Sequence, residues 1–230
     1  QRNLTEIHLK RVAVERDGTL HMEADGLGLP RWFRCDGDSL QELWPHDDKK
    51  IPLLARGFVD DGALDQVVIS YRPGRRVVLG VTDSGGERIV KGYKRQKCQH
   101  AAALHAIALS ACGEGGFKVP RLVEYTESAD YLVMTKQAGS SPAISVESTP
   151  VWAKIGAYLR QFQLSPVDDP LPAFSSRDEL AVLDERARRF LLCAPQLPAN
   201  WQRGRDLLES LMQDLPAARF GLAHRDLHDG

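Results

Sequence analysis

Residues 66–93, QVVISYRPGRRVVLGVTDSGGERIVKGY, hold the strongest structural pattern in the chain. Three runs rich in valine and isoleucine are separated by two short polar turns, Arg72-Pro73-Gly74-Arg75 and Asp83-Ser84-Gly85-Gly86. β-Branched residues favour strands, and Gly and Pro favour the tight bends between them. The pattern therefore predicts an antiparallel meander with strands over residues 66–71, 76–82 and 87–93.

A helix is expected after this meander, from about Lys97 to Ala111, because apolar residues recur along the segment at helical spacing. Gly113 stands where a left-handed residue commonly ends a helix. Residues 119–125 and 131–135 then read as two further strands. The polar segment 137–142, QAGSSP, is predicted to be a linker.

Past the linker, apolar residues recur every three or four positions, which is the period of an amphipathic helix. Helices are expected over about 151–162, 177–192 and 201–215, with Ser175 and Ser176 as candidate N-caps of the second. The residues expected on the inward faces are Val151, Ile155, Leu159 and Phe162, then Leu180, Leu183, Ala187 and Phe190, and finally Leu207, Leu208, Leu211 and Leu215.

The first 65 residues are predicted to be rich in β-structure. Short strands are expected over residues 7–14, 19–23 and 31–35, with turns at Asp17-Gly18 and Asp25-Gly26. Residues 43–55 are less regular and are expected to pack as a loop with a helical turn.

The composition indicates a globular protein, with 43% hydrophobic and 27% charged residues. Thirty basic and 31 acidic residues give a formal charge of −1, so the net charge offers no case for binding nucleic acid or an anionic membrane. No apolar run approaches the roughly 20 residues of a membrane helix. The four cysteines lack metal-site spacing and read as thiols in a reducing compartment, which predicts a cytoplasmic location.

The closing segment holds a candidate catalytic carboxylate. His224-Arg225-Asp226 follows an apolar approach and enters a polar loop. Phosphoryl transfer to a hydroxyl needs a carboxylate that orients the attacking oxygen and accepts its proton. Asp226 suits that role, and His224 is expected to brace the loop.

Lys91 is a candidate phosphate-binding residue on the third strand of the meander. Kinase-type chemistry places an ammonium group on such a strand, where it reaches the phosphates of the nucleotide. A lysine inside an apolar strand is costly unless its charge has a partner. The alternative interpretation is a lysine on an edge strand that faces solvent.

Together these features resemble the aminoglycoside phosphotransferase and choline-kinase-like superfamily of small-molecule kinases. The resemblance covers about residues 65–230 and rests on the segments 71–79, 89–93, 119–122 and 224–230. It implies an α+β, two-lobed, protein-kinase-like fold. Residues 66–138 would form the antiparallel β N-lobe, residues 139–230 the first part of a helical C-lobe, and residues 1–65 a β-rich N-terminal extension.

The resemblance implies that ATP binds between the lobes together with Mg²⁺, and that the phosphate acceptor is a hydroxyl of a small molecule. Asp226 would be the catalytic base. The loop Tyr71–Arg76 would cover the phosphates, and residues 134–139 would form the hinge that meets adenine. The nucleotide-binding residues would be Lys91, Arg72, Gly74, Arg75, Met134, Lys136 and Gln137.

The sequence departs from the family pattern in three respects. Residues 95–113 contain no acid to pair with Lys91, and Gln99, His100 or His105 stands in that place. The loop Tyr71–Arg76 has one glycine. The expected metal ligand five residues after Asp226 would be position 231, so no magnesium ligand is expected within these 230 residues, and an inactive fragment is one interpretation.

Two alternatives stay open at this stage. The first is a catalytically inactive kinase-like module that binds a nucleotide or a partner protein. The second is a metal-dependent hydrolase, because His224 and His228 are four residues apart with Asp226 and Asp229 beside them. The acceptor and the oligomeric state are not predicted.

Overall fold

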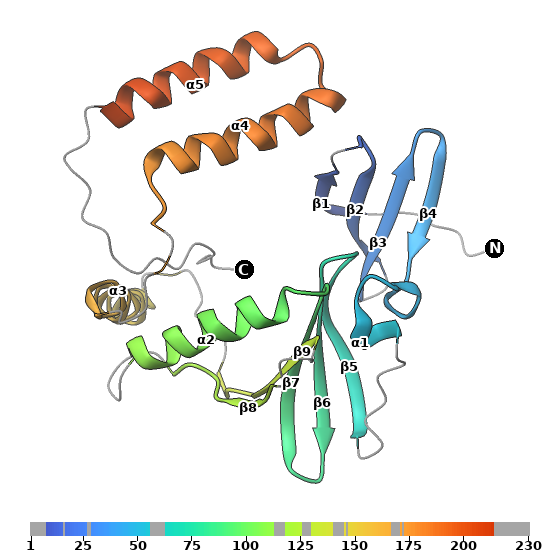
Figure 1. Cartoon of the computed structure of the whole chain (residues 1–230), viewed down its shortest axis with the longest axis vertical. Helices are drawn as coiled ribbons and strands as arrows, with labels where there is room; N and C mark the ends of the chain where they lie inside the picture. The colour runs from blue at the N-terminus through green and yellow to red at the C-terminus, as the bar shows by residue number, and fades with distance from the viewer. Residues whose placement is uncertain are drawn as a thin grey trace. The chain divides into compact units, whose positions relative to one another are not determined.

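The computed structural model describes residues 8–15, 17–26, 29–55, 63–112, 118–125, 130–139, 145, 147–166, 171 and 173–213. These residues form two compact units. The first unit comprises the described residues of 1–44 and 173–213 and contains a four-stranded sheet and two helices. The second comprises those of 45–171 and contains a five-stranded sheet with its own helices (Figure 1).

The four-stranded sheet is an antiparallel meander. Its strands are β1 (His8–Val14), β2 (Leu20–Gly26), β3 (Leu29–Asp36) and β4 (Ser39–Leu43), and they lie in that order across the sheet. The first three confirm the predicted strands, whereas β4 was not predicted. Its sequence, SLQEL, has no β-branched or aromatic residue, so its strand form depends on pairing with β3. That pairing includes an ion pair between Arg31 and Glu42.

The five-stranded sheet confirms the predicted meander and extends it. Its strands are β5 (Ala63–Arg72), β6 (Arg76–Asp83), β7 (Gly86–Tyr93), β8 (Leu122–Glu124) and β9 (Tyr131–Thr135). They lie in the order β5-β6-β7-β9-β8, and all neighbours are antiparallel. The strand expected over 119–125 is observed as β8, which has only three residues. Because β7 lies between β6 and β9, it is in the interior of the sheet.

The segment after β4 confirms the expected loop with a helical turn. It contains η1 (Pro45–Asp47) and α1 (Pro52–Ala55). Leu53 of α1 is buried and lies against Gly92 of β7. A Cβ added at position 92 would lie 2.7 Å from Leu53 Cδ2 and 3.0 Å from Val77 Cγ1, so only glycine allows this close approach.

Helix α2 (Cys98–Cys112) confirms the helix predicted after the meander and lies beside β9 (Figure 1). Its buried residues Cys98 and Ala102 pack against Leu132 of β9, with Tyr93 at the edge of this cluster. The sheet and α2 therefore share one apolar core.

Helix α3 (Thr149–Leu164) follows, and Ser165 Oγ donates to the carbonyl of Ala111 at 2.8 Å. The apolar face predicted for α3 is only partly sheltered. Val151 at its start is 48% exposed, and none of the helix residues is buried. Ile155, Leu159 and Phe162 are half-buried. The helical spacing correctly predicted the element, but it did not predict how much of the face would be covered.

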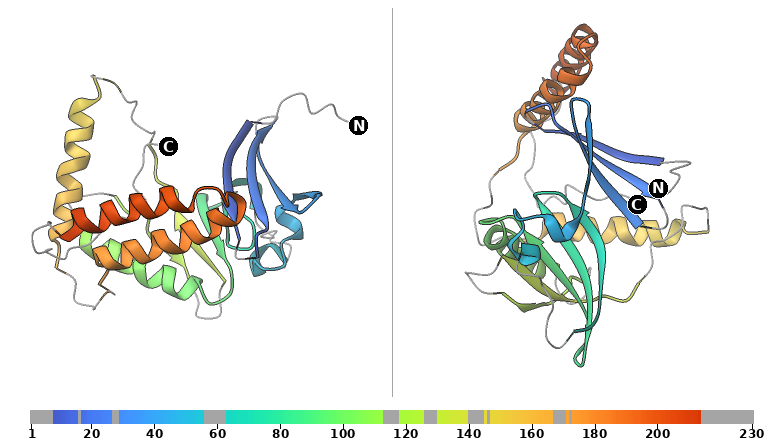
Figure 2. Two further views of the ribbon diagram at one scale, coloured as in Figure 1. Left: turned by 90° about the horizontal axis from the view of Figure 1, so that it is seen from above. Right: turned by 90° about the vertical axis from the view of Figure 1, so that its right-hand side faces the viewer.

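Helices α4 (Ser176–Cys193) and α5 (Pro198–Gln213) lie side by side and run in opposite directions (Figures 1 and 2). The predicted N-cap at Ser175 is confirmed as part of a capping box. Its side chain accepts a hydrogen bond from the Asp178 N–H, and the Asp178 carboxylate accepts one from the Ser175 N–H at 2.7 Å.

The inward faces predicted for these two helices are partly wrong. Leu180 and Ala187 of α4 are buried as predicted, but Phe190 is 53% exposed. Leu207 and Leu211 of α5 are 62% and 56% exposed. Leu208 is also exposed, Leu183 is half-buried, and Leu215 lies outside the described residues.

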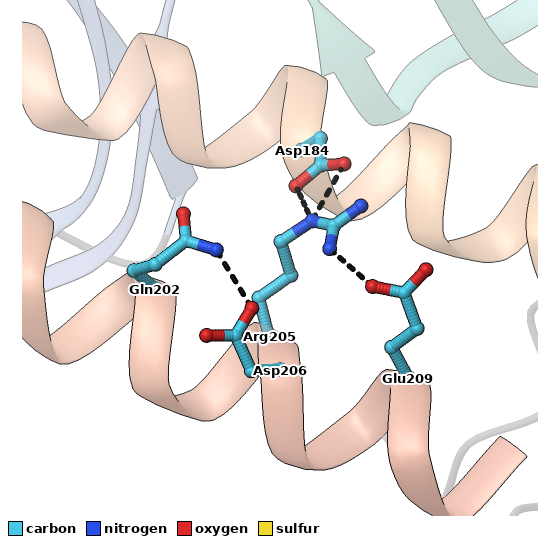
Figure 3. A network of polar contacts seen from close by, with 5 residues as sticks. All are labelled: Asp184, Gln202, Arg205, Asp206 and Glu209. Carbon is cyan, nitrogen blue, oxygen red and sulfur yellow. Dashed lines mark hydrogen bonds and ion pairs between the residues drawn. The ribbon is translucent and has the colours of Figure 1, made fainter.

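A polar contact between the helices explains why Leu207 and Leu211 of α5 do not face α4. Arg205 Nε donates to Asp184 Oδ1 of α4 at 3.0 Å, and its Nη1 donates to Glu209 at 2.6 Å (Figure 3). A residue that bonds to α4 must lie on the contact face, so the leucines two and six positions further along the helix turn away from it.

The described residues thus form antiparallel sheets and helices in a mixed α+β arrangement that is compatible with a kinase-like fold. Within this part of the chain, no helix has both the length and the apolar character needed to cross a membrane.

Candidate functional site

Lys91 lies in the interior of the five-stranded sheet. β7 is flanked by β6 and β9, and Lys91 lies opposite Val78 on one side and Leu132 on the other. Because side chains alternate along a strand, Lys91 shares its face with Ile89 and Tyr93. The alternative of a solvent-facing lysine on an edge strand is therefore wrong, since Lys91 is half-buried on a central strand.

The Lys91 ammonium has no neutralising partner in the described part of the chain. Burial lowers its pKa, and the nearby Arg76 guanidinium lowers it further. No carboxylate among the described residues forms an ion pair with it. An unpaired, partly desolvated ammonium attracts an anion from solution.

The side chains of α2 do not fill the role of partner to Lys91. Gln99 and His100 are exposed, and His105 contacts the carbonyl oxygen of Pro120 through its Nε2 at 2.7 Å. No hydrogen bond joins Lys91 to any of these three among the residues that the structure describes. The hydrogen bond between Lys91 and a neutral side chain of α2 that the sequence suggested is therefore not formed.

The turn between β5 and β6 is held by a residue that lies far from it in the sequence. Asp48 Oδ2 accepts hydrogen bonds from the Tyr71 hydroxyl at 2.9 Å and from the Gly74 N–H at 2.6 Å. Gly74 has a φ of +64°, which glycine adopts without strain. Burial, followed by the Asp48 charge, raises the pKa of Tyr71 and keeps its hydroxyl a donor.

The other residues predicted for this turn are placed at its two ends. Arg72 is the last residue of β5 and is half-buried, and Arg75 is exposed just before β6. The Arg75 N–H donates to the Arg72 carbonyl at 3.0 Å, and the Arg75 carbonyl accepts from the Lys94 N–H at 3.0 Å. The backbone of the turn is thus fixed from both sides.

The predicted hinge residues have different environments. Met134 is buried and lies opposite Ile89, on the face of the sheet that carries Lys91. Lys136 is exposed and its ammonium pairs with Glu87 at 2.8 Å. Gln137 donates to Thr135 Oγ1 at 3.1 Å. The structure therefore brings Met134 together with Lys91, while the Lys136 ammonium is held elsewhere.

The predicted catalytic residues His224 and Asp226 lie outside the described residues, as do His228 and Asp229 of the hydrolase alternative. Within the described ranges, no group of three or more His, Cys, Asp or Glu side chains is placed to hold a metal ion. The described part of the site therefore consists of the Lys91 face and the β5–β6 turn.

Sequence reasoning missed the roles of two residues in this site. Asp48 was not identified as a candidate residue, because its contact with the turn spans 26 positions of sequence. Arg76 was predicted to begin a strand and to end the loop Tyr71–Arg76, and it does begin β6, but its place beside Lys91 was not predicted. The alternation of β6 was the only signal that could have placed Arg76 on the Lys91 face.

A partly buried cation on an apolar sheet face, close to a glycine turn with a fixed backbone, has the chemistry that suits an anionic ligand. Residues 74–230 match the phosphotransferase enzyme family, which is more than half of the 230 residues. The chain therefore belongs to the phosphotransferase enzyme family. Comparison with the curated proteins and with the solved structures gave no match.

Proposed function

We propose that this protein transfers a phosphoryl group from ATP to a hydroxyl of a small molecule, in the manner of an aminoglycoside phosphotransferase. Membership of the phosphotransferase family supports the reaction type. The single observation that carries the proposal is Lys91, a half-buried cation on an apolar sheet face without a carboxylate partner among the described residues. Such a group suits the phosphates of a nucleotide.

The proposal gives the described residues the task of holding the nucleotide in a two-lobed, kinase-like fold. Lys91 would hold phosphate oxygens, and the turn containing Arg72, Gly74 and Arg75 would cover them. Met134 would contact the base. The backbone at Lys136 and Gln137 would meet its edge, because both side chains already bond within the protein.

The proposed chemistry at the acceptor belongs to the closing segment. ATP, bound with Mg²⁺, would supply the phosphoryl group and the charge neutralisation that its transfer needs. Asp226 would orient the acceptor hydroxyl and take its proton, and His224 would brace the loop. The proposal assigns no magnesium ligand within residues 1–230.

The proposed cytoplasmic location rests on the chemistry of the cysteines, and the proposed class of acceptor rests on the net charge. Cys35, Cys98 and Cys112 are free thiols, which suits the reducing cytoplasm. The near-neutral charge supports a small-molecule acceptor rather than a nucleic acid or a membrane surface.

A second candidate function is nucleotide binding without phosphoryl transfer. The observation that favours it is α2, which contains no acid and leaves Lys91 without the ion pair that usually fixes such a lysine. A module of this kind would bind ATP through the same face but would not turn it over.

The test is ATP turnover by the full-length protein with Mg²⁺ and a panel of hydroxyl compounds. Asp226→Asn should lower kcat by 10²-fold or more and leave ATP affinity within about twofold, because the carboxylate acts on the acceptor proton. Asp229→Asn is the matched control and should retain most activity, whereas a metal hydrolase would lose it. Full activity of Asp226→Asn would refute the assignment, and ATP binding without turnover would favour the binding module.

A further inference from the structure

Arg76 and Lys91 lie on the same face of the five-stranded sheet. On β6, Arg76 and Val78 are two residues apart and therefore point to the same side. Val78 lies directly opposite Lys91, and Arg76 lies directly opposite Tyr93. Arg76 is thus the diagonal neighbour of Lys91, within reach of its long side chain.

Arg76 is half-buried, and its Nε is buried without a hydrogen-bond partner among the described residues. Its charge reaches Lys91, because it helps to lower the pKa of that ammonium. Neither side chain forms an ion pair in the described part of the chain. Among the residues that the structure describes, two neighbouring cations are therefore partly removed from water without a compensating anion.

This arrangement costs stability unless an anion binds there. Burying an unpaired donor of a charged group is unfavourable, and a second like charge adds repulsion. A bound polyphosphate would remove both costs at once. The guanidinium is also the side chain best matched to phosphate, because its planar N–H groups can engage two oxygens together.

We propose that Arg76 is a second phosphate-binding cation, and that Arg76 and Lys91 together hold the triphosphate of the nucleotide. This inference rests on the proposed function and deepens it. The turn that Asp48 and Lys94 hold directly precedes Arg76, so the start of β6 is fixed before any ligand binds.

The same face also indicates how the ligand is oriented. The cations stand near the β5–β6 turn, whereas the next row along β6, β7 and β9 is apolar and consists of Gly80, Ile89 and Met134. Successive rows on one face are about 6–7 Å apart. The triphosphate therefore lies near the turn, and the base lies one or two rows away over the apolar residues.

The test measures binding of tripolyphosphate, ATP and adenosine by calorimetry, with and without Mg²⁺. The variants are Arg76→Gln, Arg76→Lys and Lys91→Met. The matched control is Arg88→Gln, because Arg88 lies on the opposite face of β7, where it pairs with Asp83 at 3.4 Å.

Arg76→Gln should weaken tripolyphosphate and ATP binding about tenfold or more and leave adenosine binding within twofold. Arg76→Lys should lose less, because it keeps the charge, and Arg88→Gln should bind all three probes as the parent protein does. Without ligand, Arg76→Gln should have a Tm no lower than that of the parent, since an uncompensated charge is removed. A purely structural arginine would instead lower the Tm and affect adenosine and ATP alike.

The outcomes separate the inference from the function. ATP turnover by the parent, with unchanged tripolyphosphate binding in Arg76→Gln, would overturn the inference and leave the function intact. Tripolyphosphate binding that depends on Arg76, without ATP turnover, would support the cation pair and refute the kinase. A parent protein that binds neither ATP nor tripolyphosphate would overturn both.

Discussion

The Asp48 carboxylate holds the β5–β6 turn, and its replacement should loosen that turn by a predictable amount. Its Oδ2 accepts from the Tyr71 hydroxyl and the Gly74 N–H, and its Oδ1 accepts from the exposed Lys50 N–H at 3.0 Å. A hydrogen bond to a charged group contributes about 1.5–3 kcal/mol. Counting only the two partly buried bonds, Asp48→Ala should lower the free energy of unfolding by roughly 3 kcal/mol.

The assay is urea denaturation followed by circular dichroism. Asp48→Asn can place its one amide oxygen where Oδ2 stands and keep both hydrogen bonds without the charge, so it should lose about half as much as Asp48→Ala. Asp47→Asn is the matched control, because Asp47 is exposed and its replacement should change stability by no more than about 0.5 kcal/mol. If ATP binds under this turn, Asp48→Asn should also weaken ATP binding.

A double-mutant cycle isolates the contact itself. Tyr71→Phe removes the hydroxyl and keeps the ring, so a coupling energy of about 1.5 kcal/mol with Asp48→Ala is expected. Strictly additive losses, or an Asp48→Ala variant as stable as the parent, would refute the reasoning that this carboxylate organises the turn.

Three further predictions concern packing and ionisation. Gly92→Ala should lower the free energy of unfolding by about 1–3 kcal/mol, because there is no room for a Cβ at position 92. Gly156→Ala, in open space on α3, should raise it by about 0.5–1 kcal/mol. Denaturant titrations measure both changes. Burial raises the pKa of Cys98 to about 11, so iodoacetamide should modify the half-buried Cys35 first and Cys98 only on unfolding, and equal rates in peptide mapping would contradict this. The pKa of Lys91 is lower in the folded protein than its ordinary value of 10.5, so between these two pKa values the unfolded chain binds more protons than the folded one. The free energy of unfolding of the parent therefore rises with pH in that range. Lys91→Met should accordingly raise the free energy of unfolding above that of the parent by more at pH 7 than at pH 10, as measured by urea titrations.

Local patterns predicted most elements of the fold correctly. The meander over 66–93, α2 and the N-cap at Ser175 were predicted because each depends on neighbouring residues: β-branched runs, glycine turns, apolar spacing and a capping serine. β4 was missed because its residues have little strand preference and it forms only against β3. Leu207 and Leu211 of α5 were assigned inward because spacing alone does not reveal the bond from Arg205 to Asp184.

The residues of the candidate site also divide into those that local sequence patterns predicted and those that they did not. Lys91 and Gly74 were predicted from strand alternation and turn chemistry, and the structure places them on the sheet and the turn as expected. The contact of Asp48 with the turn and the place of Arg76 beside Lys91 were not predicted. Asp226 and His224 stay predictions, because they lie outside the described residues.

The sequence by itself determined the family, the hairpins and the presence of a lysine on the third strand of the meander, because these are properties of short segments. Only the tertiary structure decided that Lys91 lies in the interior of a sheet, that Arg76 stands beside it, and that Asp48 holds the adjoining turn. The physical reason is that strand register and burial join residues far apart in the chain. A charge has or lacks a partner only once those residues have been brought together.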